Sequence, residues 1–554
     1  MLLCAEGGAS LSNMSNRVQL LVVILVIVVA RRGLDAQQQN GNGSRSFRRT
    51  DTARADTTSS QPVTLNMTSL GADPSGINDS AAAIRAIIAV VGTQPLTLYF
   101  PKGTYRLASH GATSEECVRI SSSISLLGDG PGKTTFTDDP VPACVGQFGF
   151  FWSIGTSSQD DYSFESDPGY PVNASSASSG SSAITLIRAG DAGHYTAGQY
   201  VYLRGARLPQ PGEFHGELNI VTSVDSAAGT VTLTWPLSSD FTSDVGLQLN
   251  PVGNNEVLTN IQISGITFSF HDNAILAAQV LGLSIFNNEF LYQGVIRGNE
   301  ANQFNQIRNA EFYNNMVKNP SGNSVDIERT SNNWDIHDNT LYGPFDAGEA
   351  GANMNFHNNT ITCVNTSTNT CIRFGGTTGN IVDSNKMYES GSPAYGIIDV
   401  SGPVTSPKTV ISNNQIVAAS ARAIVAQSQG TVISGNTIFS AGVGIDINAD
   451  GVIANNNAVT LTVPSSVCVL VEGTGNRNSI SGLNCAGFSA AYNKGVYVTA
   501  LGPQAGPQLV ITGVTGNNLL NGIYVLNPAV VPTITNCTFT NTIAPFYPLG
   551  IAQQ

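Results

Sequence analysis

The stretch Ile336-His337-Asp338-Asn339-Thr340-Leu341 decides the fold, because its pattern returns along much of the chain. Each copy has an apolar residue, two small or polar residues, a fourth position that is often Asn, one further residue and an apolar residue. Clear copies begin at Phe356, Ile411 and Ile433. Successive copies lie 20 to 31 residues apart, and a period of this size indicates a solenoid of stacked coils. The fourth position falls at residues 266, 288, 315, 339, 359, 385, 414, 436, 456, 483, 514 and 537.

The segments between these copies predict short strands, because apolar and other residues alternate in them, as in Gly444-Ile445-Asp446-Ile447-Asn448. Strands stacked about 4.8 Å apart with their apolar residues inward would form an all-β parallel β-helix. The recurrent Asn would lie at an inward turn, where its amide can bond the Asn above and below. Ile266, Leu483, Val514 and Cys537 take this position near the two ends, where apolar packing would replace the ladder. The alternative is a β-sandwich with Asn-rich turns, which twelve matches in phase disfavour.

The charge of the chain limits its partners. Its 38 acidic and 25 basic side chains give 554 residues a net charge of −13. This balance argues against nucleic acid as a partner. An acidic substrate would therefore need a local basic patch rather than the overall field of the protein.

The N-terminus predicts export. Residues 20–30 form an unbroken apolar run that is short for a membrane span and typical of a signal peptide. We therefore interpret residues 1–36 as a signal peptide or signal anchor, and the polar residues 37–61 as a disordered linker. The protein is expected to be secreted, or attached to a membrane with the β-helix outside the cytoplasm.

Some of the cysteines are placed to form disulfides. Of the eight, Cys363 and Cys371 bracket one turn and could form a disulfide; Cys117 and Cys144 are a second, weaker pair. Cys537 occupies a ladder position and is expected to be a buried thiol. The chain contains no Cys-x-x-Cys or zinc-ligand spacing.

Three motifs near the N-terminus carry a family resemblance. Leu70–Asp79, Leu98–Tyr105 and Leu127–Pro131 resemble the opening of the pectate-lyase superfamily, and its rhamnogalacturonase/epimerase-like branch in particular. The resemblance implies a right-handed parallel β-helix over most of residues 65–540. It also implies action on polysaccharides, since the superfamily includes hydrolases, lyases, epimerases and phage tailspikes. The Asp-Asp and Gly-His-Gly signatures of polygalacturonases are absent.

The chain is divided by these patterns into a cap, an insert and the main coils. Residues 62–136 are expected to hold the first coils and a capping helix that starts at Asp79 or Ser80 and stops at Gly92. Its apolar face would cover the open end of the solenoid with Ile84, Ile87, Ile88 and Val91. We expect residues 137–255 to form an inserted small β-domain, which could form one wall of a substrate groove. The main coils are expected over residues 256–543, and a C-terminal tail over residues 544–554. The strands expected in the insert are Ala183–Arg188, Gln199–Leu203, Ile220–Val224 and Thr230–Thr234.

Charged residues gather on the strand that precedes each ladder copy. Aligning these strands places an outward row on neighbouring coils, which continues through Val425 to Tyr497 and Tyr524. Its charged members are Arg297, Asp326, Glu328, Asp346, Arg373 and Asp399. Stacking would place the backbones of Asp326 and Asp346 about 5 Å apart, and those of Asp346 and Asp399 about 10 Å apart. Both spacings bracket the carboxylate pairs of glycoside hydrolysis, and like charges this close should raise one pKa.

The leading hypothesis is hydrolysis of a uronic-acid-containing, pectin-like polysaccharide without a cofactor. The catalytic carboxylates would be Asp326, Glu328, Asp346 and Asp399. The substrate would be held by Arg297, Arg329 and Arg373, because guanidinium groups pair with carboxylates. Asp446 occupies an equivalent outward place but is expected to have no charged neighbours.

Three other interpretations remain open. In a lyase, Arg373 or Arg329 would abstract a proton and acidic residues would hold Ca²⁺. The chain could instead be a non-catalytic glycan-binding surface protein, with its acidic residues at solvated strand ends. His337 and His357, which stack on adjacent coils near Asp383, suggest a metal site, although a solvated face is favoured and no metal ligand is assigned.

Overall fold

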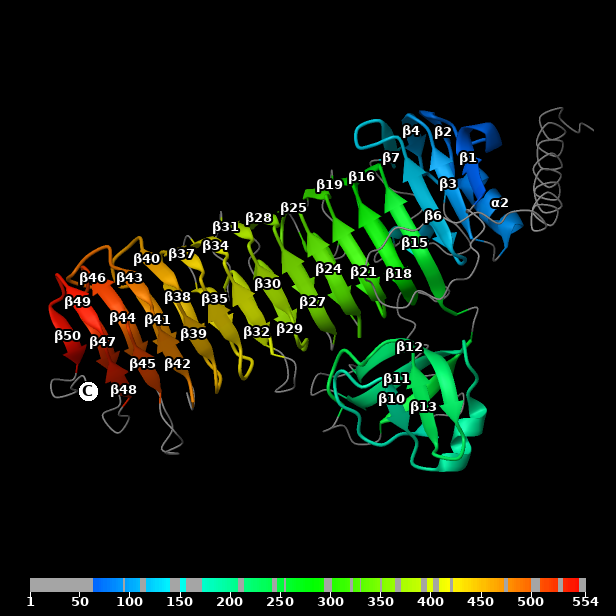
Figure 1. Ribbon diagram of the computed structural model, residues 1–554. Coiled ribbons are helices and arrows are strands. Elements are labelled where there is room, and N and C mark those ends of the chain that lie inside the picture. Colours follow the sequence, from blue (N-terminus) through cyan, green and yellow to red (C-terminus); the bar gives the residue numbers. More distant parts are fainter. Residues whose placement is uncertain are drawn as a thin grey trace, which may run out of the picture.

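The computed structural model shows a long solenoid with a second, smaller body beside it (Figure 1). The expected signal segment and linker lie outside the described residues, and so do Arg297, Arg329 and Cys144. In the part of the chain that is described, no helix is both long and apolar enough to cross a membrane. The described residues are 63–92, 95–109, 116–139, 150–155, 172–207, 214–241, 247–253, 256–292, 301–318, 322–328, 330–348, 351–363, 370–389, 396–401, 408–418, 422–472, 477–499, 509–526 and 532–547.

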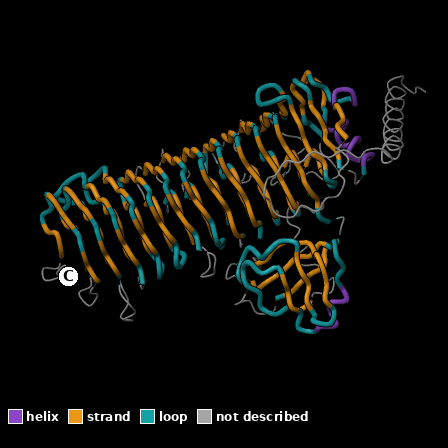
Figure 2. Tube along the Cα trace, in the orientation of Figure 1, coloured by secondary structure: helices purple, strands orange, loops and turns teal. Residues whose placement is uncertain are grey.

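Each coil of the solenoid adds one strand to each of three parallel sheets, as expected for a right-handed parallel β-helix. Sheet 1 lies before the Asn turn, sheet 2 after it, and sheet 3 completes the coil. Figure 2 shows the coils as one continuous stack of strands with short turns.

The strands of sheet 1, in spatial order, are β1 (Val63–Asn66), β3 (Leu96–Phe100), β6 (Ile124–Gly128), β15 (Leu258–Ser264), β18 (Val280–Phe286), β21 (Arg308–Tyr313), β24 (Asn332–His337), β27 (Ala352–His357), β30 (Ile381–Asp383), β33 (Val410–Ser412), β36 (Val432–Ser434), β39 (Ile453–Asn455), β42 (Ser479–Ser481), β45 (Val510–Thr512) and β48 (Thr533–Thr535). Those of sheet 2 are β2 (Ser75–Asp79), β4 (Gly103–Arg106), β7 (Thr134–Thr137), β16 (Thr267–Phe270), β19 (Glu289–Tyr292), β22 (Met316–Lys318), β25 (Thr340–Tyr342), β28 (Thr360–Cys363), β31 (Lys386–Glu389), β34 (Gln415–Ala418), β37 (Thr437–Ser440), β40 (Ala458–Leu461), β43 (Asn484–Ala486), β46 (Thr515–Asn517) and β49 (Thr538–Thr540). Those of sheet 3 are β5 (Glu116–Ile120), β8 (Phe150–Ile154), β17 (Ile275–Ala278), β20 (Asn302–Asn305), β23 (Val325–Glu328), β26 (Phe345–Ala347), β29 (Ile372–Gly375), β32 (Ile398–Ser401), β35 (Arg422–Ala426), β38 (Val443–Ile447), β41 (Val467–Val471), β44 (Lys494–Val498), β47 (Asn521–Val525) and β50 (Ala544–Tyr547).

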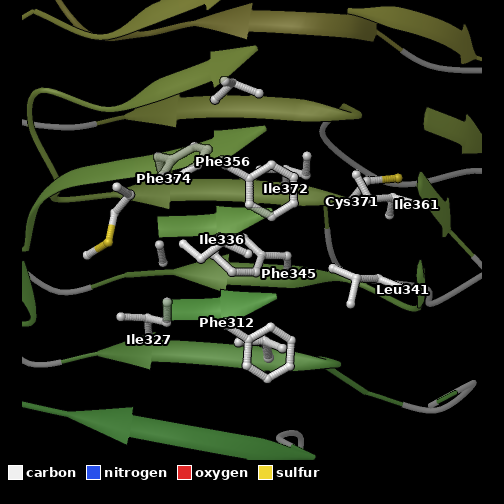
Figure 3. Packing of buried hydrophobic residues seen from close by; sticks show 14 of the residues in the cluster. Phe312, Ile327, Ile336, Leu341, Phe345, Phe356, Ile361, Cys371, Ile372 and Phe374 are labelled. Atoms are coloured by element: carbon white, nitrogen blue, oxygen red, sulfur yellow. The ribbon is translucent and has the colours of Figure 1, made fainter. Parts of the chain in front are cut away.

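The core is a column of apolar side chains that stack on equivalent residues of the next coil. Phe312, Ile336 and Phe356 come from successive strands of sheet 1 and are fully buried. They meet Leu341 and Ile361 of sheet 2 inside the coil (Figure 3). Because every coil repeats this arrangement, an outward position on one coil lies beside the outward position of the next.

The predicted Asn ladder is present from residue 288 to residue 457. Asn414, for example, donates from Nδ2 to the Val382 carbonyl oxygen at 2.8 Å and to Asn436 Oδ1 at 3.0 Å. Its Oδ1 accepts from the backbone N–H of Asn385 at 2.9 Å. The buried amide thus satisfies buried backbone groups, as its burial requires.

The residue before each of several ladder positions adopts a left-handed backbone conformation. Asn358, Asn413 and Gly435 have φ of 55°, 55° and 66°, which is left-handed backbone that Asn and Gly adopt most readily. Asn456 also has a positive φ, of 52°, and it is Asn457 that bonds Asn436. The ladder position assigned to residue 456 is therefore wrong by one residue, because a run of three Asn left the register open.

The capping helix forms as expected. Helix α2 (Ala81–Val91) buries Ile84, Ile87 and Ile88 against the first coil. Asp79 Oδ1 accepts from the backbone N–H of Ala81 at 3.0 Å and so satisfies one of the first N–H groups. A 3-10 helix, η1 (Met67–Leu70), lies beside it.

The insert is a six-stranded antiparallel sheet with its own core. Its predicted start at residue 137 is wrong, because β8 pairs with β5 and β17 inside sheet 3. The end of the coils at 543 is also too early, since β50 pairs with β47. In spatial order the sheet consists of β10 (Ala183–Thr185), β13 (Thr230–Leu233), β12 (Phe214–Asp225), β11 (Tyr200–Arg207), β14 (Gln248–Val252) and β9 (Val172–Asn173), with the 3-10 helix η2 (Ala189–His194).

The insert docks on the solenoid through buried polar contacts. Arg308 of β21 donates to Glu217 Oε1 at 2.8 Å, and the two side chains are 1% and 0% exposed. Arg308 also donates to the Pro236 carbonyl oxygen at 2.9 Å. Tyr202 Oη donates to Thr330 Oγ1 at 2.8 Å. The insert therefore touches the corner between sheet 3 and sheet 1.

Disulfides link neighbouring parts of the coils. Cys363 and Cys371 are bonded, as predicted from their spacing. Cys468 and Cys485 form a second disulfide that the sequence patterns did not indicate. Cys117 is also disulfide-bonded, and Cys537 keeps a buried thiol. Burial raises the pKa of this thiol.

Candidate functional site

The outward row predicted on sheet 3 exists, and strand register defines it coil by coil. Asp326 pairs with Asp346, Asp346 with Arg373, and Arg373 with Asp399. The full row after β17 is Gln303, Asp326, Asp346, Arg373, Asp399, Val425, Asp446, Leu470, Tyr497, Tyr524 and Tyr547. Gln303 takes the place expected for Arg297.

Asp346 and Arg373 form the centre of the row. Arg373 Nε donates to Asp346 Oδ1 at 2.8 Å. The Asp346 side chain is only 15% exposed, whereas that of Arg373 is 48% exposed. Burial raises the pKa of Asp346, although the Arg373 guanidinium opposes the shift.

Glycine makes room for this guanidinium. A Cβ at Gly348 would lie 3.0 Å from Arg373 Nη2 and 3.6 Å from Asp346 Oδ1. The pKa of Arg373 is raised: burial lowers it, but Asp346, Asp326 and Asp399 outweigh that effect. Arg373 therefore remains a fixed cation with part of its surface open to an anionic ligand.

Asp399 lies one coil beyond Arg373 and is 8% exposed. Burial raises its pKa to about 6, with Arg373 lowering it and Asp346 raising it further. Gln427 Nε2 lies 3.4 Å from Asp399 Oδ1. A carboxyl group with this pKa can carry a proton near neutral pH, which is what a general acid requires.

Asp326 and Glu328 lie on β23, on the coil before Asp346. Asp326 is 3% exposed, and its Oδ2 accepts from Asn323 Nδ2 at 3.2 Å. Glu328 Oε2 accepts from Gln303 Nε2 at 2.8 Å. The side chains of Asp326, Asp346 and Asp399 are largely buried. The alternative that these acidic residues lie at solvated strand ends is therefore wrong.

Asp446 is not isolated, which corrects the expectation drawn from the sequence. It is fully buried and its Oδ2 is bonded by Arg422 Nη1, while Arg422 Nη2 lies 3.8 Å from Glu472 Oε2. Burial raises the pKa of Asp446 to about 6, with Arg422 opposing and Glu472 and Asp399 adding to the shift. Arg422 was missed because it lies on β35, outside the outward row, and reaches Asp446 only along its side chain.

The histidine face is part of a stack of rings. His337 and His357 pair across β24 and β27, and Asp383 follows on β30. The two imidazoles stack at 5.0 Å, and Tyr313 stacks on His337 at 5.0 Å. His357 Nε2 lies 2.9 Å from Asp335 Oδ1. Among the described residues, no group of three or more His, Cys, Asp or Glu is placed to hold a metal ion.

The row thus combines buried carboxyl groups with a half-exposed cation. Two strand spacings, about 10 Å, separate the backbones of Asp346 and Asp399, with Arg373 between them. Such a set can bind an anionic sugar and transfer protons on both sides of a glycosidic bond.

Comparison with known families supports the resemblance seen in the sequence. Residues 64–157 match the model of the family described as "Rhamnogalacturonase A/epimerase, pectate lyase-like". The chain is therefore a parallel β-helix, and its first coils are similar to that family. No curated protein matches the chain.

Solved structures confirm the fold over most of the chain. The tailspike gp61 of Pseudomonas phage phi297 aligns with a TM-score of 0.55 and 14% identity, over 86% of this chain and 83% of the tailspike. The tailspike protein gp49 of Pseudomonas phage LKA1 aligns with a TM-score of 0.51 and 13% identity, over 87% and 83%. The N-terminal fragment of gene product 12 of bacteriophage Phi29 aligns with a TM-score of 0.50 and 12% identity, over 86% and 71%. At these identities the likeness concerns the right-handed β-helix itself.

Proposed function

We propose that this protein hydrolyses an acidic, uronic-acid-containing polysaccharide on the outward face of sheet 3. The observation that carries the proposal is the order Asp346, Arg373, Asp399 in one row of three neighbouring coils. The two carboxyl groups with raised pKa would serve as acid and base, and the cation between them would bind the sugar carboxylate.

Asp399 is assigned as the general acid, because its pKa of about 6 keeps a substantial protonated fraction in weakly acidic solution. Asp346 is assigned as the general base that activates water. Its ion pair with Arg373 favours the carboxylate form that a base needs. The wide spacing of the pair suits an inverting enzyme, in which water enters between substrate and base.

Hydrolysis is favoured over β-elimination by the state of Arg373. An arginine that abstracts a proton must first lose its own, yet Asp346, Asp326 and Asp399 raise the pKa of Arg373. The arginine is therefore better suited to hold a carboxylate than to act as a base. The disulfides Cys363–Cys371 and Cys468–Cys485 support the proposal that this activity is extracellular.

The test is cleavage of polygalacturonate, rhamnogalacturonan and alginate, measured as new reducing ends. We expect Asp346→Asn and Asp399→Asn each to lower kcat by about 10²–10⁴-fold while binding persists. Asp335→Asn, on the outward face of sheet 1, is the matched control and should keep the parent rate.

Two results would contradict the proposal. A product that absorbs as an unsaturated uronate would establish β-elimination instead of hydrolysis. Full activity of Asp346→Asn on a substrate that the parent cleaves would place the site elsewhere.

A further inference from the structure

The C-terminal end of sheet 3 carries a second chemical feature in the same row. Tyr497, Tyr524 and Tyr547 occupy the row on the last three coils, on β44, β47 and β50. Lys494, at the start of β44, lies with its Nζ 4.2 Å from the Tyr497 ring centroid and 5.3 Å from that of Tyr524. These four residues are called the tyrosine–lysine cluster below.

The rings of the cluster form a partly exposed aromatic surface. Tyr524 and Tyr547 stack at 4.6 Å with planes 6° apart, whereas Tyr497 meets Tyr524 edge to face at 5.0 Å and 76°. Tyr547 is 41% exposed, and the other two rings are half-buried. The three side chains carry apolar ring surface and hydroxyl groups that can hydrogen-bond a ligand. Tyrosines combine these properties at many binding surfaces.

Lys494 differs from the two arginines on earlier coils of sheet 3. Arg373 and Arg422 are each paired with a carboxylate. No described carboxylate forms an ion pair with Lys494, and partial burial lowers its pKa. A partly desolvated cation without a counter-charge attracts an anionic ligand. Because the net charge of the chain is −13, an anionic ligand depends on such a local cation.

We propose that the tyrosine–lysine cluster is a remote subsite that binds the same acidic glycan chain as the Asp346–Arg373–Asp399 site. Lys494 would pair with a uronate carboxylate, and the tyrosines would pack against the apolar faces of the sugar rings. The inference rests on the proposed function for its substrate class, but binding at the cluster can be measured without cleavage.

The register determines how long the glycan must be. From Arg373 to Tyr497 the row advances by five strand spacings, which is about 24 Å. A short oligosaccharide held at Arg373 cannot reach this far, whereas a polymer that runs along the solenoid can. The cluster should therefore increase affinity for long chains only.

Affinity electrophoresis in gels with polygalacturonate or alginate tests the subsite directly. The Asp346→Asn variant is used as background so that the polymer stays intact. Adding Lys494→Met should weaken retardation by both polymers about tenfold, through loss of one charge-assisted contact. Lys494→Arg should keep most of the affinity. Lys386→Met, which removes an exposed lysine from sheet 2, should match the background variant.

A kinetic comparison completes the test. In the active protein, Lys494→Met and Tyr547→Ala should raise KM for the polymer and leave kcat/KM for a trigalacturonate unchanged. The inference is overturned if Lys494→Met and Lys386→Met bind the polymers equally, if neither polymer retards the background variant, or if Lys494→Met affects short and long substrates alike. If the parent cleaves nothing, the proposed function fails and the electrophoresis still decides the subsite.

Discussion

Replacing Asp399 by Asn should stabilise the fold in a pH-dependent way. The carboxyl group is 8% exposed, and burial raises its pKa to about 6 from about 4 in an unfolded chain. Between these two values the folded protein binds more protons than the unfolded chain, so stability falls as the pH rises from about 4 to about 6. Above pH 6 the full cost of burying the charge is present, and below pH 4 it is absent.

The size of the effect follows from the shift. Two pKa units correspond to about 3 kcal/mol, which is the upper limit of the gain at pH 8. Asn keeps the shape and loses the charge, but its buried amide still needs hydrogen bonds, so we expect a gain of about 1–2 kcal/mol. At pH 4, where the cost of burying the charge is absent, only the cost of the buried amide remains, so the Asp399→Asn variant should unfold at a lower denaturant concentration than the parent.

The measurement is urea unfolding, followed by circular dichroism, at pH 4 and pH 8. Asp383→Asn is a matched control, for which we expect the opposite change in stability at pH 8. Burial raises the pKa of Asp383, but bonds from Ser412, Ser384 and Asn413 outweigh this, so its pKa is lowered in the folded protein. Its loss should therefore lower the midpoint at pH 8. An Asp399→Asn midpoint that shifts equally at both pH values, or that falls at pH 8, would refute the reasoning.

Asn414→Leu should lower the unfolding free energy by about 2–6 kcal/mol, because two buried backbone groups lose their partners at about 1–3 kcal/mol each. Asn413→Gly, at an exposed left-handed position that is Gly one coil later, should change little, and equal melting temperatures for the two variants would contradict the ladder. Glu217→Ala should cost about 3–5 kcal/mol, since it leaves Arg308 buried without its carboxylate, and limited proteolysis should then release the insert. Arg106→Ala breaks a partly exposed pair of similar length and should cost much less than Glu217→Ala; the same loss in both variants would count against a buried docking contact.

The sequence patterns determined much of the coil. Inward and outward residues alternate with period two, so aligning strands was enough to place Asp326, Asp346, Arg373 and Asp399 in one row. The ladder was equally readable, because a buried amide and a left-handed backbone position each restrict the residue type. Near residue 456 three Asn follow one another, so two adjacent pairs of residues fit the left-handed position and the buried amide position equally well. The sequence pattern therefore placed the buried amide one residue too early.

Only the tertiary structure decided the environment of these residues. Arg422 reaches Asp446 across coils along a flexible side chain, and no spacing rule predicts such a contact. Burial raises the pKa of Asp399 and Asp446. How deeply these side chains are buried depends on the neighbouring coils and side chains, which the strand pattern alone does not give. The docking of the insert through Arg308 and Glu217 joins residues 91 positions apart, which local periodicity does not encode.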